Sequence, residues 1–316
     1  MVKGHRVCYR FVPSQMLPPL NCLAISGSAA GAGASLTLVE ACWHALVLGI
    51  VQGITEFLPI SSTAHLKVVP MVLGWGDPGV AVTAVIQLGS IVAVLAYFRS
   101  DLQEVIGAVG SAVRDGRWSD PGARLGVAIA LGTVPILLAG VAIKLWFPNF
   151  ENSPLRSVTS IAIVSIAMAL LLALAELVGR RRRQLEEVMP RDGLLVGVAQ
   201  MLAIVPGVSR SGSTLTASLF DGWKRPAAAR FSFLLGIPAI VLAGLVELKD
   251  ALRSDAVGGP IPMLVGVISA ALVSWWAIGW LLRFLQSNST WLFVGYRLVF
   301  GLSILLWFRG LDAAPR

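Results

Sequence analysis

Two polar stretches interrupt an otherwise apolar chain, and they hold the residue types that carry chemistry. The first, "TEFLPISSTAHL" at residues 55–66, gathers a carboxylate, three adjacent hydroxyls and a histidine, which are Glu56, Ser61, Ser62, Thr63 and His65. The second, "IVPGVSRSGST" at residues 204–214, places Arg210 among further hydroxyls. Ionisable side chains are costly at membrane depth and usually functional there. We therefore interpret the two stretches as halves of one site.

The second stretch has the composition of an oxyanion site. Arg210 offers a planar guanidinium that can bind two phosphate oxygens at once. Pro206 and Gly207 end one helix arm, so the next arm begins here with free N–H groups and the positive end of its dipole. Hydroxyl donors surround the guanidinium: Ser209, Ser211, Ser213 and Thr214. The alternative is that Arg210 pairs with Glu56 for structural reasons only.

The first stretch also admits a structural interpretation, in which Ser61 and Thr63 only cap the second arm of a broken helix. That interpretation does not account for Glu56 and His65. These two residues lie nine positions apart across a proline break, so they could converge on one pocket.

The composition is that of a polytopic membrane protein. Of the 316 residues, 56% are hydrophobic and 13% are charged, whereas roughly a quarter of a soluble domain is charged. Loop arginines that set membrane topology and meet anionic lipid explain the net charge of +8 more simply than nucleic-acid binding does. Cys8, Cys22 and Cys42 lack CxxC or Cys/His spacing, so neither a disulfide framework nor a zinc site is indicated.

The sequence predicts an all-α membrane fold with six transmembrane helices and two re-entrant helical hairpins. A span takes about 20 apolar residues, and the stretches of that kind are residues 80–98, 124–146, 157–178, 230–248, 260–282 and 291–308. Residues 43–74 and 193–220 are apolar but broken midway, with arms of about 8 to 16 residues, near half a bilayer. Irregular backbone at membrane depth is tolerated only beside protein or a wet cavity. Each break is therefore a candidate site.

The two broken regions also indicate an internal repeat. Gln52 precedes Pro59 by seven residues, and Gln200 precedes Pro206 by six. Each unit then holds one hairpin and three spans. Because three is odd, the second unit must enter the membrane inverted, an arrangement known from other membrane proteins.

The predicted organisation is one integral membrane domain at residues 41–310, built from repeats at about 41–178 and 193–308. We expect residues 1–40 to be a disordered extension without a part in the chemistry, and residues 311–316 to be a short tail.

Loop charge predicts the orientation of the domain. Most loop arginines and lysines fall on one side of this topology, around residues 99–124, 180–191 and 224–230, and the opposite loops hold only Arg156, Lys249 and Arg253. The first group is predicted to be cytoplasmic. Two polar residues lie inside predicted spans: we interpret Gln87 as a contact between helices, whereas Arg297 either neutralises a carboxylate or helps to draw an anionic head group.

The two polar stretches, taken with their flanking residues, resemble those of a known family. "LVLGIVQGITEFLPISSTAHL" and "IVPGVSRSGST" are similar to the paired motifs of the undecaprenyl-diphosphate phosphatases, bacterial membrane enzymes linked to bacitracin resistance. The resemblance covers about residues 40–310. It implies hydrolysis of undecaprenyl diphosphate to undecaprenyl phosphate, the lipid carrier of cell-wall precursors, in the bacterial inner membrane. It also implies the inverted-repeat fold.

The resemblance further implies roles for individual residues. The family's (E/Q)xxxE and PGxSRSxxT segments are "QGITE" and "PGVSRSGST" here, which makes the expected catalytic residues Glu56, Ser62, His65 and Arg210. The residues expected around the substrate are Gln52, Ser61, Thr63, Gly207, Ser209, Ser211 and Thr214. We expect Ser62 to be the nucleophile and His65 to pass a proton, with activated water as the alternative attacker.

A divalent cation, Mg²⁺ or Ca²⁺, is expected at Glu56 and the diphosphate, although Gln52 stands where many members carry a second glutamate. The competing interpretation is a transporter or lipid flippase, because secondary transporters share inverted repeats with broken helices. The expected partners are the prenyl diphosphate and the membrane, without nucleic acid, and a homodimer is left open.

Overall fold

The fold is helical throughout the described part of the chain. The computed structural model describes residues 36–147, 150, 153–251 and 259–312. The expected tail therefore lies largely outside the described residues, as does most of the expected N-terminal extension. The helices are α1 (Leu38–Phe57), α2 (Ser62–Val72), α3 (Gly79–Tyr97), α4 (Arg99–Asp115), α5 (Pro121–Trp146), α6 (Val158–Val178), α7 (Pro190–Met201), α8 (Arg210–Phe220), α9 (Arg225–Ala251), α10 (Pro260–Ser287) and α11 (Trp291–Asp312), with the 3₁₀ turns η2 (Pro154–Arg156), η3 (Leu185–Glu187) and η4 (Leu202–Ile204).

Six of the described helices are long and apolar enough to cross a membrane, namely α1, α3, α5, α6, α9 and α10. The predicted class, an all-α polytopic membrane protein, is confirmed. The predicted span at 291–308 is α11, a helix of 22 residues whose apolar run is described as far as Trp307. Helix α1, predicted to be one arm of a hairpin, is itself long and apolar enough to cross a membrane. The reason is a capping box between Thr37 and Glu40, which starts α1 well before residue 43 and gives it 20 residues.

Both predicted hairpins are helix–break–helix units. The first consists of α1 and α2, and the second of α7, η4 and α8. Helices α2, α7 and α8 have 11 or 12 residues, near half a bilayer at about 1.5 Å per residue. Each break ends at a serine with positive φ, 77° at Ser61 and 71° at Ser209. Such a conformation is rare outside glycine, so its recurrence supports the repeat. Re-entry of each hairpin on one side of the membrane stays a prediction.

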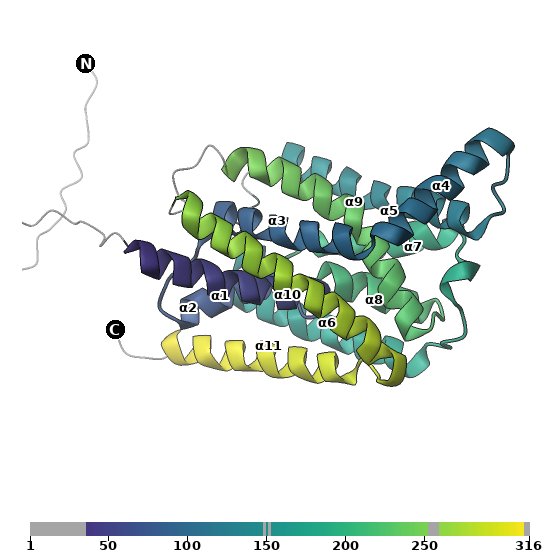
Figure 1. Ribbon diagram of the computed structural model, residues 1–316. Coiled ribbons are helices and arrows are strands. Elements are labelled where there is room, and N and C mark those ends of the chain that lie inside the picture. Colours follow the sequence, from purple (N-terminus) through teal and green to yellow (C-terminus); the bar gives the residue numbers. More distant parts are fainter. Residues whose placement is uncertain (1–35, 148–149, 151–152, 252–258, 313–316) are drawn as a thin grey trace, which may run out of the picture. The chain divides into compact units, whose positions relative to one another are not determined.

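Helix packing has the pattern that an inverted repeat requires. The first arm of each hairpin packs on the other unit, α1 on α10 and α7 on α5, while α3 packs on α9 and α6 on α11. Glycines permit the closest contacts: a Cβ on Gly49 would lie 1.8 Å from Ser269 Oγ, and a Cβ on Gly193 would lie 2.0 Å from the Ala128 carbonyl oxygen. In Figure 1, α1 and α2 lie toward the left of the helical domain and α7 and α8 toward the right, so the two hairpins come from opposite ends.

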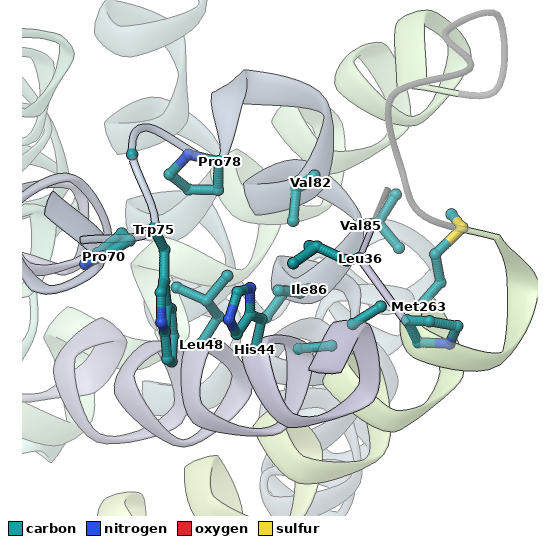
Figure 2. A pocket seen from close by; sticks show the side chains of 14 residues that line it. Leu36, His44, Leu48, Pro70, Trp75, Pro78, Val82, Val85, Ile86 and Met263 are labelled. Atoms are coloured by element: carbon teal, nitrogen blue, oxygen red, sulfur yellow. The ribbon is translucent and has the colours of Figure 1, made fainter. Parts of the chain in front are cut away.

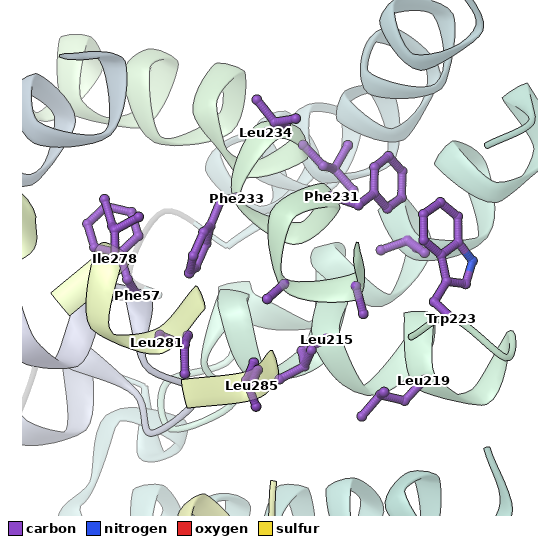
Figure 3. Packing of buried hydrophobic residues seen from close by; sticks show 14 of the residues in the cluster. Phe57, Leu215, Leu219, Trp223, Phe231, Phe233, Leu234, Ile278, Leu281 and Leu285 are labelled. Atoms are coloured by element: carbon purple, nitrogen blue, oxygen red, sulfur yellow. The ribbon is translucent and has the colours of Figure 1, made fainter. Parts of the chain in front are cut away.

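The largest apolar core surrounds the second hairpin. Figure 3 shows side chains of α8, α9 and α10 packed together with Phe57 from the end of α1. The rings of Phe57 and Phe233 meet edge to face with centroids 5.4 Å apart. The end of α1, which carries Glu56, is thus held in place by the helices of the other unit.

The charged loops that were predicted to be cytoplasmic lie together. Arg230 pairs with Asp101, and Arg183 pairs with both Asp192 and Asp221. Partial burial lowers the pKa of Arg183, but the hydrogen bond and charge of Asp192 and the charge of Asp221 outweigh that effect, so the pKa is raised above its usual value. The two pairs of Arg183 join the start of α7 to the end of α8, the two ends of the second hairpin. Residues 99–115 were expected to be loop, whereas they form the amphipathic helix α4.

Candidate active site

Glu56 is the point where the two hairpins meet. It lies in the last turn of α1 and accepts hydrogen bonds from Ser62 Oγ at 2.7 Å, Gln52 Nε2 at 3.1 Å and Arg210 Nη2 at 3.3 Å. The Glu56 and Arg210 side chains are only 9% and 10% exposed, so their charges interact in a largely dry environment. The structure therefore brings together four of the predicted site residues, one carboxylate with its three donors.

The backbone around Ser62 leaves a helix N-terminus open toward this cluster. The positive φ of Ser61 turns the chain so that Ser62 is the first residue of α2. Ser61 makes no capping hydrogen bond with its side chain, which lies 3.1 Å from Thr63 Oγ1 instead. The capping interpretation is thus wrong for Ser61. Free N–H groups at a helix start bind anions, and here they lie beside a hydroxyl.

The second hairpin uses most of its hydroxyls for its own structure. Ser209 caps α8 by accepting from the Gly212 N–H at 3.1 Å. Ser211 Oγ donates to the Leu58 carbonyl at 3.0 Å, and Thr214 Oγ1 donates to the Arg210 carbonyl at 2.8 Å. These residues were predicted to surround the substrate. In the structure Ser211 joins the two breaks, whereas Ser209 and Thr214 bond within their own hairpin.

The Arg210 guanidinium packs closely on a glycine, and one of its nitrogens has no hydrogen-bond partner in the described part of the chain. Its guanidinium passes over Gly236 of α9, where an added Cβ would lie 1.6 Å from Nη1. Nη1 is buried and finds no hydrogen-bond partner in the described part of the chain. A buried donor without a partner calls for a ligand or water, so Nη1 is available to an oxyanion.

Arg297 connects the two breaks to each other. Its guanidinium donates to the carbonyl oxygens of Gly207 at 2.7 Å, Val208 at 3.1 Å and Pro59 at 3.2 Å, and its Nε donates to Ser165 O at 3.2 Å. It forms no ion pair with a described carboxylate. Of the two predicted roles, the neutralisation of a carboxylate is therefore wrong for the described residues. The predicted substrate residue Gly207 is one of these acceptors, with φ of +95°.

His65 lies beside the cluster without touching it. In the neutral ring, Nδ1 donates to the Ser61 carbonyl at 2.7 Å and Nε2 accepts from the Tyr296 hydroxyl at 2.6 Å. The ring also stacks on Phe300, with centroids 4.2 Å apart. His65 and Glu56 were expected to converge on one pocket; they bond to neighbouring residues of one turn, Ser61 and Ser62, and not to each other. Sequence reasoning missed Tyr296, although it stands next to Arg297 in "VGYRLVFG".

A polar cavity of about 330 Å³ adjoins the cluster. Its lining includes Gln52, Ser62, Thr63 and Gln87. Gln87, expected to be a contact between helices, therefore faces a cavity. The space next to Ser62 can admit a phosphate group.

A separate apolar cavity of about 200 Å³ lies near the start of α1. Figure 2 shows its lining, in which His44 stacks on Trp75 among aliphatic side chains. Such a lining suits hydrocarbon and lacks the cations that a diphosphate needs. Of the two cavities, the polar one has the lining that suits a phosphate group.

A metal ion would find few protein ligands at the cluster. The described residues contain no group of three or more His, Cys, Asp or Glu side chains placed to hold a metal. Glu56 is the one carboxylate that contacts Ser62 and Arg210. A cation at Glu56 would thus depend on the diphosphate for most of its ligands, which is the usual manner of Mg²⁺.

Comparisons with known proteins show the family of the chain. The profile of the family described as "Bacitracin resistance protein BacA" matches residues 45–303. An undecaprenyl-diphosphatase of Synechococcus sp. (strain WH7803) is 68% identical over 273 residues, which cover 86% of this chain and 96% of the relative. An undecaprenyl-diphosphatase of Synechococcus sp. (strain CC9605) is 70% identical over 275 residues, which cover 87% of this chain and 96% of the relative. Another, of Prochlorococcus marinus (strain MIT 9313), is 67% identical over 274 residues, which cover 87% of this chain and 92% of the relative. The chain belongs to the bacitracin resistance protein BacA family.

Proposed function

We propose that the chain hydrolyses undecaprenyl diphosphate to undecaprenyl phosphate and inorganic phosphate in the bacterial cytoplasmic membrane. The observation that carries the proposal is the convergence of Ser62 and Arg210, from different hairpins, on Glu56. Ser62 and Gln52, both bonded to Glu56, also line a polar cavity, which supports a role for Ser62 as nucleophile with Glu56 as base and Arg210 as anion clamp. Relatives with about two thirds or more of their residues identical carry the name undecaprenyl-diphosphatase, and six apolar helices suit a lipid substrate.

The first step is attack by Ser62 on the terminal phosphorus. Glu56 accepts the hydroxyl proton, because the Ser62 hydroxyl already donates to it at 2.7 Å. The new bond joins Ser62 Oγ to phosphorus, and the bond to the bridging oxygen breaks with its electron pair going to undecaprenyl phosphate. Water then hydrolyses the phosphoserine, releases inorganic phosphate and restores the serine. This assignment gives Glu56 the proton-transfer role that sequence reasoning gave to His65.

Charge that develops during transfer is met by donors already in place. Arg210 supplies Nη1, which has no other described partner, and the start of α2 supplies backbone N–H groups next to Ser62. Preorganised donors of this kind need little rearrangement during the reaction. His65 and Tyr296 lie behind Ser61 and orient the turn that presents Ser62.

A divalent cation would add a charge that neutralises the diphosphate when it is bound. Glu56 is the residue of this chain that would hold it. Because Glu56 also receives Ser62, Gln52 and Arg210, we propose that phosphate release depends on Mg²⁺ or Ca²⁺ through the substrate more than through a protein cage.

The test is phosphate release from undecaprenyl diphosphate by the purified protein in detergent, with and without a chelator. Turnover in detergent needs no second compartment, so it separates an enzyme from a transporter. The matched control is Ser62→Ala in the same preparation. Release that is equally fast from the alanine variant would show that a contaminating phosphatase is responsible.

A further inference from the structure

The cavity beside Ser62 is also lined by three charged residues that the proposed reaction does not use. They are Lys67 of α2, Asp77 of the α2–α3 connection and Arg156 of η2. Ser62 and Lys67 are five residues apart on the same short helix. The lining of this cavity thus contains the proposed nucleophile and two cations.

Neither cation is firmly held by a described carboxylate. Lys67 Nζ lies 3.7 Å from Asp77 Oδ2, and the two side chains are 26% and 56% exposed. A pair of this length and exposure contributes little to stability, so Lys67 can exchange its partner. Arg156 forms no ion pair with a described residue, and a guanidinium suits phosphate oxygens.

We propose that Lys67 and Arg156 form a second anion subsite, which receives the inorganic phosphate after hydrolysis and from which phosphate leaves. The identity of this anion as product rests on the proposed function. Asp77 weakens phosphate binding at this subsite. Its carboxylate pairs with Lys67 when phosphate is absent and repels phosphate when phosphate is bound. Release is thereby favoured over retention.

Substitution of the two cations and substitution of Asp77 should change inhibition by inorganic phosphate in opposite directions. We expect Lys67→Gln and Arg156→Gln each to raise the phosphate inhibition constant by about fivefold to tenfold, the range of one charge-assisted contact at a partly exposed site. Asp77→Asn should lower it by about threefold, because a repelling charge is removed. Asparagine keeps the cap on α3, since Asp77 Oδ1 accepts from the Gly79 N–H at 3.0 Å and the amide oxygen can do the same.

Controls separate local from general effects of charge. Lys144→Gln removes a positive charge in the last turn of α5, away from the cavity lining, and should leave the constant unchanged. Lys67→Arg keeps the charge and should stay within about twofold of the wild type. All measurements use one ionic strength, because exposed charges are screened by salt.

A second measurement tests phosphate binding at the subsite without any hydrolysis of lipid. Titration of the wild type and the three variants with inorganic phosphate, followed by ³¹P line broadening without lipid, reports binding directly. Binding that follows the charge pattern while no lipid diphosphate is hydrolysed would support the subsite and refute the proposed function. Normal hydrolysis with an inhibition constant that is unchanged in both glutamine variants, or that rises in Asp77→Asn, would overturn the subsite.

Discussion

The position of the Arg210 guanidinium depends on a hydrogen atom at Gly236. A methyl group there would lie 1.6 Å from Nη1 and 2.7 Å from Cζ of Arg210. Real Cβ contacts are essentially never this short, so the methyl group and the guanidinium cannot occupy their present positions together. In Gly236→Ala the guanidinium must therefore leave Glu56 Oε1, which it now approaches to 3.3 Å.

The expected effects on activity and on stability differ in size. Loss of one preorganised donor to the transition state lowers the rate by about 10²–10³-fold, or about 2.7–4 kcal/mol. Alanine is better than glycine inside a helix by about 1 kcal/mol, while overpacking costs about 1–3 kcal/mol. The net change in the free energy of unfolding should thus be no more than about 2 kcal/mol. The variant should fold and be nearly inactive.

The assay is phosphate release from undecaprenyl diphosphate at saturating lipid, beside a thermal unfolding curve for each protein. Gly140→Ala in α5 is the matched control, because no atom outside its own helical turn lies within 4 Å of the position that the new methyl group would take. It should keep wild-type activity. A Gly236→Ala enzyme within twofold of the wild type would contradict the placement of Arg210.

A double variant tests whether Gly236→Ala lowers activity by displacing the Arg210 guanidinium. Arg210→Lys alone should lose about a hundredfold in rate, because an ammonium cannot reproduce the planar guanidinium. Lysine also lacks the branch that meets the methyl group. Adding Gly236→Ala to Arg210→Lys should therefore cost little more, so the two effects are not additive. Full additivity would mean that Gly236→Ala acts through another route.

Three further predictions concern the nucleophile, the two breaks and the topology. Ser62→Ala should abolish turnover, and acid quench of the wild type should trap labelled phosphate on the Ser62 peptide; an alanine variant that keeps a tenth of the rate, without a phosphopeptide, would identify water as the attacker. Arg297→Met should lower the free energy of unfolding by several kcal/mol, since each carbonyl left without a partner costs about 1–3 kcal/mol; an unfolding midpoint equal to that of the wild type would refute this. In a chain whose native cysteines are replaced by serine, Leu155→Cys should react with an impermeant thiol reagent from outside the cell and Arg182→Cys should not, and the reverse would overturn the orientation but not the chemistry.

The convergence of two distant stretches could be predicted because polar residues in an apolar chain have few explanations. Glu56 and Arg210 were expected in one site, and they lie in contact. The inference that Glu56 and Arg210 share a site rests on the cost of an unpaired charge at membrane depth. The same reasoning could not assign partners. It placed His65 and Glu56 near one pocket but did not identify the partner of His65, which is Tyr296, a residue more than two hundred positions away.

The differences in the fold arise where local chemistry outweighs hydropathy. The apolar pattern suggested a start near residue 43 for the first hairpin, but Thr37 and Glu40 form a capping box that extends α1. Residues 99–115 carry too many charges for a span, yet Val105 and Ala112 bury one face of α4. Hydropathy averages over a window, so it detects neither a cap nor one buried stripe on a short helix.

The inverted repeat accounts for the pairing of a serine with an arginine in the site. Ser62 and Arg210 are equivalent, because each is the first residue of a half-helix that follows a serine with positive φ. A pseudo-two-fold arrangement brings two such helix starts to one point, and both contribute their positive dipole ends. The two hairpins differ in how the side chain before each half-helix bonds. Ser209 caps its helix while Ser61 leaves its own open, so one half can present a nucleophile with free N–H groups and the other a clamp. Exchange of the two residues, Ser62→Arg with Arg210→Ser, should therefore not restore activity, since the Ser209 cap takes up one of the N–H groups at the start of α8 that a phosphoryl group would need.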